Sequence, residues 1–237
     1  MRIVVITDVH ANLPALRAVL EEVDQLGYDR IIHTGDAIGI GPYPAECLEL
    51  LLNIPRIQFT LGNHDWLFVN GLPDQPSERM SKSEVEHQLW THAQLTREMR
   101  SQLALWPLSV EHDFDGFGVT FTHYGTSENR ILPCVPNPGP ADLDEMFSDT
   151  RGAFVFFGHD HVGADIRGTR RYLNPGSLGC SRKAVANYCV AEFSRGVSDI
   201  QMRSVPYDDE MLFQTFEKRE VPARHGFYKT RFGGRYS

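Results

Sequence analysis

The chain has 237 residues, of which 41% are hydrophobic and 23% are charged, and its formal net charge is −8. This length and composition are typical of one α/β domain with a buried core. The acidic balance disfavours non-specific binding to nucleic acid or to an anionic membrane surface, because both favour a basic protein. It leaves open a small anionic substrate held by a local positive site.

Cysteine usage and hydropathy indicate where the protein works. The four cysteines show no spacing typical of a metal site, so we expect reduced thiols and a cytoplasmic protein. No signal peptide is expected, because the first apolar run is short and is interrupted by Asp8 and His10. No stretch approaches the ~18 apolar residues of a membrane span, so no membrane partner is expected. The oligomeric state stays open.

Strands are predicted to alternate with helices over the first part of the chain. Apolar runs predict strands over residues 2–7, 30–34, 56–61, 118–122 and 153–157. A helix is predicted over 13–26, with Asn12 as its N-cap and Gly27 as its stop, and a second one over 44–52, opened by a proline. Later runs alternate in polarity and predict a set of antiparallel strands over residues 164–167, 170–173, 187–193 and 199–205. A helix is predicted after them, over residues 207–218.

Two segments do not fit this alternation. In the segment 66–110, residues recur at steps of three and four, on one face of a long helix or of two consecutive helices: Val85, Leu89, His92, Thr96, Met99, Leu103 and Trp106. This helical insertion either caps a cleft or packs on the sheet as ordinary structure. The basic tail, about 218–237, is expected to be a solvated or loosely docked end of a single domain spanning 1–237.

Five predicted strands are followed by residues that can bind a metal ion. In chain order these residues are Asp8 and His10, Asp36, Asn63 with His64 and Asp65, His123, and His159 with His161. If the strands are parallel neighbours, their carboxyl ends share one edge of the sheet and the residues converge. A single histidine after a strand is more often a hydrogen-bonded core residue, but five such segments in register favour a site.

The types of donor narrow the metal. Carboxylates, imidazoles and one carboxamide, without a thiolate, suit Mn, Fe, Co, Ni or Zn rather than Ca or an iron–sulfur cluster. Seven donors are too many for one ion that must keep a position open for catalysis. Two ions that share a carboxylate fit better, and such pairs typically clamp a phosphoryl group during in-line displacement.

The order of these motifs, DxH, GD, GNHD, H and GHxH, resembles that of the calcineurin-like metallophosphoesterase superfamily. The sequences GPYP at 41–44 and NPGS at 174–177 resemble its small bacterial and archaeal phosphodiesterase branch. The resemblance implies a four-layer α/β/β/α sandwich. It also implies two divalent transition-metal ions, with Mn expected first and Fe, Zn, Ni or Co also compatible.

The resemblance further implies a role for each site residue. One ion would be held by Asp8, His10, Asp36 and His161. The other would be held by Asp36, Asn63, His123 and His159, so that Asp36 bridges the two. His64 would face the phosphoryl group. Because a departing alkoxide needs a proton, we further expect His64 to donate it, the alternative being a structural histidine held by Asp65. Asp65 would orient an imidazole or cap a turn. The candidate substrate contacts are Asn63, His64, Tyr43, Arg130 and Arg182.

Two departures bear on the reaction. The second motif reads GDAIGIG and lacks the arginine of the phosphatase pattern GDxxDRG, and Cys180 stands where the branch often has QPR. We therefore expect hydrolysis of a small phosphorylated substrate such as a nucleotide, above all a phosphodiester, by in-line attack of a metal-bridging hydroxide. The alternatives are a phosphomonoesterase or a dinucleoside polyphosphate hydrolase. A non-catalytic scaffold of the same fold is disfavoured by the complete set of ligands.

Overall fold

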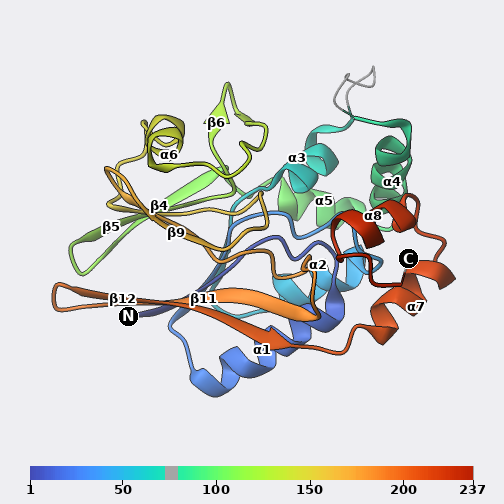
Figure 1. Cartoon of the computed structure of the whole chain (residues 1–237), viewed down its shortest axis with the longest axis horizontal. Helices are drawn as coiled ribbons and strands as arrows, with labels where there is room; N and C mark the ends of the chain where they lie inside the picture. Colours follow the sequence, from blue (N-terminus) through green and yellow to red (C-terminus); the bar gives the residue numbers. More distant parts are fainter. Residues whose placement is uncertain (73–79, 237) are drawn as a thin grey trace.

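The computed structural model describes residues 1–72 and 80–236, and two five-stranded sheets face each other in it (Figure 1). The first sheet contains, in spatial order, β12 (Val197–Pro206), β11 (Val185–Ser194), β1 (Arg2–Ile6), β2 (Arg30–His33) and β3 (Ile57–Phe59). The second contains β4 (Ser109–Phe114), β5 (Phe117–Thr122), β8 (Phe154–Phe156), β10 (Arg171–Asn174) and β9 (Ala164–Arg167). Helices cover the outer faces, which confirms the predicted four-layer sandwich.

The five strands that lead to the site are divided between the two sheets. In the first sheet β1, β2 and β3 run parallel, so their carboxyl ends lie at one edge. In the second sheet β5 and β8 also run parallel to each other. The expected convergence is therefore achieved by stacking two parallel groups rather than by five neighbours in one sheet.

The main core lies between the sheets. Ile3, Val5 and Ile32 of the first sheet pack with Phe121 and Phe156 of the second, and all five are fully buried. A second cluster joins the outer face of the first sheet to α1 (Leu13–Leu26) and α2 (Pro44–Leu52). A third joins the outer face of the second sheet to α6 (Pro140–Met146). This burial on both sides explains the continuous apolar runs of the central strands.

Helix α1 begins and ends as the sequence predicts. The Asn12 side chain accepts the Ala15 N–H at 3.1 Å, and Gly27 follows the last turn with a positive φ of 68°. In the described ranges, 1–72 and 80–236, no helix is long and apolar enough to cross a membrane.

The insertion, residues 66–110, begins within α3 (Asn63–Asn70) and contains α4 (Lys82–Ala93) and α5 (Arg97–Leu103). Its residues 73–79 lie outside the described part. Two consecutive helices are confirmed for α4 and α5, but the predicted face of α4 is wrong. Leu89 is 56% exposed, whereas His87 and Gln88 are buried. The inward side of α4 carries two polar contacts, from His87 to the Ile40 N–H and from Gln88 to His64, and Trp90 beside them packs on an apolar cluster. The last residues of the insertion are not helical, because strand β4 begins at Ser109.

The basic tail is not solvated. After α7 (Glu210–Lys218) the chain forms α8 (Arg224–Thr230), which lies beside α4 in Figure 1. Tyr228 and Phe232 are buried in a cluster with Ile40 and Cys180, and Arg219 Nη1 donates to the Pro42 carbonyl at 2.6 Å. The expectation of a loosely docked end is therefore wrong, because its aromatic residues pack inward while its charges stay outside. A short hairpin, β6 (Thr126–Ser127) and β7 (Arg130–Ile131), was also not predicted.

Candidate metal centre

The first group of candidate ligands comes from the loops after β1, β2 and β8. His10 Nε2 lies 2.8 Å from His161 Nε2, and Asp8 Oδ1 lies 3.5 Å from each of these nitrogens. Asp36 Oδ2 lies 3.7 Å from His10 Nε2. Four donor atoms from residues up to 153 positions apart in sequence thus surround one small volume.

The second group shares Asp36 with the first. Asp36 Oδ2 lies 3.4 Å from His123 Nε2, which in turn lies 3.1 Å from Asn63 Oδ1 and 3.2 Å from His159 Nδ1. The structure therefore brings all seven predicted ligands together, and a single carboxylate oxygen borders both groups.

The backbone of these loops is strained where the ligands attach. Five of the candidate ligands have φ between 46° and 76°, a range that residues other than glycine seldom adopt: Asp8, His10, Asp36, His159 and His161. Two glycines allow close approach, since a Cβ on Gly62 would lie 2.1 Å from Asp36 Oδ1 and one on Gly158 would lie 2.0 Å from Thr7 Oγ1. Strain of this kind, about 1–3 kcal/mol per residue, is concentrated at functional sites in proteins.

The aspartates and histidines of the two groups shift one another's pKa values. Burial alone would raise the pKa of the Asp8 carboxyl, but His161 and His10 hold it well below its ordinary value. Burial alone would lower the pKa of His123, but the Asp36 carboxylate raises it to about 9. Burial and the charge of His123 lower the pKa of His159 to about 4. The two aspartates are therefore carboxylates at neutral pH, as metal ligands must be.

The unsatisfied atoms fit a divalent metal ion. Asp8 Oδ1 is buried and has no hydrogen-bond partner within the described residues. The two facing Nε2 atoms of His10 and His161 need a proton or a cation between them. His123 Nδ1–H donates to the Thr34 carbonyl at 2.9 Å, so Nε2 is the nitrogen from which a metal ion would displace a proton.

His64 lies beside the first group. Its ring is 5.2 Å from that of His10 in an edge-on arrangement, and its backbone N–H donates to Asp36 Oδ1 at 2.9 Å. Its Nδ1 is 2.7 Å from Gln88 Nε2 of α4. Burial lowers the pKa of His64 to about 3, so the imidazole is neutral at physiological pH. Donor atoms of His10, Asp36 and His64 also lie within 4.8 Å of one another, so His64 has the reach of a ligand as well.

Asp65 caps a turn. Its carboxylate accepts the backbone N–H groups of Asp36 at 2.8 Å, Gly62 at 3.0 Å and Ala37 at 3.1 Å. Burial and the charge of Asp36 raise its pKa to about 7. The hydrogen bonds of Asp65 are made to backbone and none of the described ones joins it to an imidazole, so its geometry matches the second of the two predicted roles. It holds the Asp36 loop against the start of α3.

A sequence profile described as the calcineurin-like phosphoesterase superfamily domain matches residues 1–196, which include every candidate ligand. The chain belongs to this superfamily. Membership supports a phosphoester hydrolase that binds divalent metal ions, which agrees with the donor atoms brought together here.

Similar proteins cover nearly the whole of this phosphoesterase. An uncharacterized protein of Methanocaldococcus jannaschii, MJ0912, is 29% identical over 93% of each chain. A metallophosphoesterase from Sphaerobacter thermophilus is 26% identical with a TM-score of 0.71, over 94% of this chain and 95% of its own. The hypothetical protein PH1004 from Pyrococcus horikoshii is 18% identical with a TM-score of 0.81, over 93% and 94%, and shows the same fold.

The three predicted substrate contacts outside the cluster have other neighbours. The Tyr43 hydroxyl is 2.6 Å from Thr215 Oγ1 of α7. Arg130 is exposed on the β6–β7 hairpin, and Arg182 is exposed at the position where Gly233 of the tail approaches. In the described part of this phosphoesterase none of the three is hydrogen-bonded to the candidate ligands, and their roles remain predictions.

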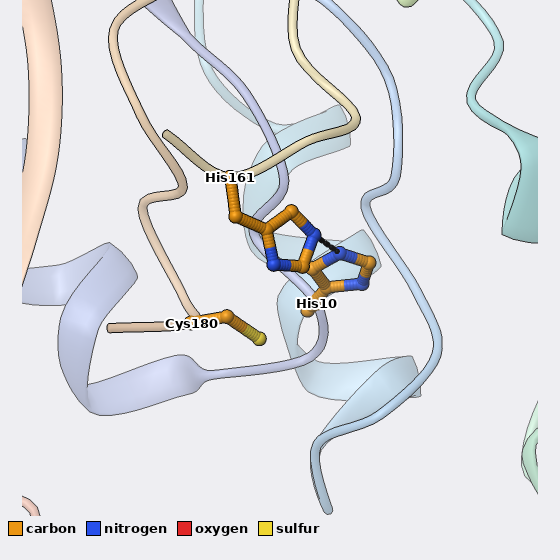
Figure 2. A group of neighbouring side chains, drawn as sticks. All are labelled: His10, His161 and Cys180. Carbon is orange, nitrogen blue, oxygen red and sulfur yellow. Dashed lines mark hydrogen bonds between the residues drawn. The ribbon is translucent and has the colours of Figure 1, made fainter. Parts of the chain in front are cut away.

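A thiol lies closer to the centre than the sequence suggested. Figure 2 shows Cys180 beside His10 and His161, and one donor atom from each of the three lies within 4.8 Å of the others. Burial raises the pKa of this thiol well above its ordinary value. The expected donor set contained no thiol, because nothing in the cysteine spacing relates Cys180 to the histidines. Its position directly after the NPGSLG turn was the available signal.

A cation of the tail acts on the charges of the centre. The charge of Arg231 contributes, after burial, to lowering the pKa of His64 and opposes the rise in the pKa of Cys180. Its side chain is exposed and makes no hydrogen bond or ion pair with the residues that the structure describes. From the sequence alone, Arg231 was expected to be one of several charges of a solvated or loosely docked tail.

Proposed function

We propose that this phosphoesterase hydrolyses a small phosphodiester, such as a nucleotide diester, using two divalent metal ions, with Mn²⁺ as the first choice. The position of the Asp36 carboxylate supports the proposal, because its Oδ2 borders both donor groups at 3.4 Å and 3.7 Å. Asp8, His10 and His161 would complete one site, and Asn63, His123 and His159 would complete the other. When bound, the ions would neutralise phosphoryl charge and lower the pKa of water.

The residues around the two sites have separate tasks in this proposal. Asp65 keeps the Asp36 loop in register with the start of α3. Asn63 and His64, at that helix end, face the substrate phosphoryl group. Because its imidazole is neutral, His64 donates a hydrogen bond to the departing oxygen, instead of the proton transfer that the sequence led us to expect, and stabilises the charge that develops there.

Diester preference rests on the second motif. Ile40 stands where phosphatases of the superfamily have an arginine, and it is buried, so no cation from this loop can bind the additional charge of a monoester. Arg231 is the observation that favours the second candidate, a phosphomonoesterase, because an exposed cation near His64 would attract a dianion.

The test is a substrate panel with Mn²⁺ present. We expect a higher kcat/KM for bis(p-nitrophenyl) phosphate than for p-nitrophenyl phosphate, with nucleotides and dinucleoside polyphosphates included for comparison. Asp8→Asn, prepared in parallel, should lose turnover and so excludes a contaminating phosphatase. A clear reversal of the ratio would support the monoesterase. Bound metal without turnover of any substrate would support a scaffold.

A further inference from the structure

Helix α4 of the insertion is fixed to the loop that follows Asp36. His87 Nε2 accepts the Ile40 N–H at 2.7 Å, and both residues are buried. Trp90, one turn further on, packs against the apolar cluster that contains Ile40 and the aromatic residues of the tail. One face of α4 is therefore held against the second motif, residues 35–41. This contact fixes the position of the neighbouring Gln88 side chain.

Gln88 is buried and meets His64. The relative exposure of Gln88 is 4%, and its Nε2 lies 2.7 Å from His64 Nδ1. The loop beneath leaves room for this contact through Gly39, where an added Cβ would lie 2.4 Å from the same nitrogen. Gly39 also has a φ of +87°, which disfavours any side chain there. The partner of the imidazole is thus supplied by the insertion and not by the motif.

The chemistry of the contact selects one form of the imidazole. An amide nitrogen can only donate, so Nδ1 must accept, and a neutral ring then carries its proton on Nε2. Nε2 has no hydrogen-bond partner among the described residues, and the ring edge lies beside His10. Gln88 Oε1 is buried and also unpartnered in the described part of the chain, a cost that proteins retain mainly where a polar group serves a function.

We propose that Gln88 is the positioning residue of His64: its side-chain amide fixes the Nε2–H tautomer and directs that N–H toward the leaving oxygen of the substrate. The inference rests on the proposed hydrolase function. A carboxamide suits the role because it holds the ring without adding a charge near the Asp36 carboxylate. The helical insertion is then a part of the active site and not only a cover for it.

The decisive variant is Gln88→Met, which keeps the size of the side chain and removes the hydrogen bond. Gln94→Met, on an exposed glutamine at the end of the same helix, is the matched control. The first readout is long-range ¹H–¹⁵N NMR on the Zn²⁺-loaded protein, with the His64 signals assigned by their loss in His64→Asn. We expect an Nε2–H tautomer in the wild type and in the control, and a mixture of tautomers in Gln88→Met.

The second readout is kinetic. With a diester that has a poor alkyl leaving group, Gln88→Met should lower kcat by about 10- to 100-fold, because the negative charge on the departing oxygen is localised there and loss of one such hydrogen-bond donor typically costs about 10²–10³-fold. With p-nitrophenolate, which delocalises its charge over the ring, kcat should fall by less than about 3-fold, and KM and metal content should not change. A second variant, Gln88→Asn, shortens the side chain and should resemble Gln88→Met in both readouts.

An Nδ1–H tautomer in the wild type would overturn the proposal. Equal rate losses on both leaving groups, or loss of metal from Gln88→Met, would also overturn it and indicate a purely structural role. If the wild type hydrolyses no diester, the proposed function fails. The tautomer measurement would still decide whether Gln88 sets the state of His64, because it does not depend on turnover.

Discussion

Replacing His33 by asparagine should flatten the dependence of stability on pH. His33 is fully buried at the end of β2, with its ring centroid 5.7 Å from that of Phe59 and 6.0 Å from that of Trp106. Its Nδ1 accepts the Gly35 N–H at 3.2 Å, and its Nε2 is buried without a partner within residues 1–72 and 80–236. Burial lowers the pKa of this imidazole from 6.5 to about 3.

The sign follows from which state binds the proton. Below pH 6.5 the unfolded chain protonates this histidine and the folded chain does not, so the contribution of His33 is complete above pH 6.5 and is lost as the pH falls toward 3. Between pH 6.5 and 5 the free energy of unfolding should fall by about 1.6 kcal/mol from this group, from 1.36 kcal/mol per pKa unit.

The assay is urea unfolding of the metal-free protein at these two pH values. His33→Asn keeps an acceptor for the Gly35 N–H and removes the titrating group, so its fall should be smaller than that of the wild type by about 1.6 kcal/mol. His225→Asn, at an exposed site, should keep the wild-type dependence. Identical falls for the wild type and His33→Asn would refute the reasoning.

Two further predictions concern the shared carboxylate and the docked tail. Protein reconstituted with Mn²⁺ should approach two ions per chain by elemental analysis. Asp36→Ala should lose more metal and more activity than Asn63→Ala, because Asp36 Oδ2 borders both donor groups. A single tightly bound ion that saturates activity would contradict this prediction. Phe232→Ala removes a fully buried ring and should lower the free energy of unfolding by about 3–5 kcal/mol in denaturant titrations. The exposed Lys229→Ala should change it by less than about 0.5 kcal/mol, and an equally small effect of Phe232→Ala would mean that the tail undocks easily.

The convergence of the candidate ligands was predictable because their signal is local and repeated. Each apolar run that ends in Asp, Asn or His reports a buried strand followed by a polar loop, and parallel pairing then requires those loops to meet. The division of the five strands between two sheets was not predictable from the runs themselves. Burial on both faces gives the same apolar pattern in either arrangement, and only the pairing of β5 with β8 distinguishes them.

The neighbours of the site were harder to predict, because their placement depends on distant contacts. The apolar residues that include Leu89 predicted the wrong inward face for α4. The buried His87 accepts the N–H of Ile40, 47 residues earlier in the chain, and the buried Gln88 contacts His64. In the tail, the many positive charges predicted a solvated segment, although its aromatic residues pack inward.

The docked tail also affects how the protein is completed during synthesis. Residues 210–232, which cover Ile40 and Cys180, follow both sheets along the chain and leave the ribosome after them. A nascent chain can therefore assemble all seven candidate ligands while this apolar patch is still open. Chaperones and proteases that recognise exposed apolar surface would encounter a polypeptide whose candidate ligands are already assembled and whose apolar patch is still exposed.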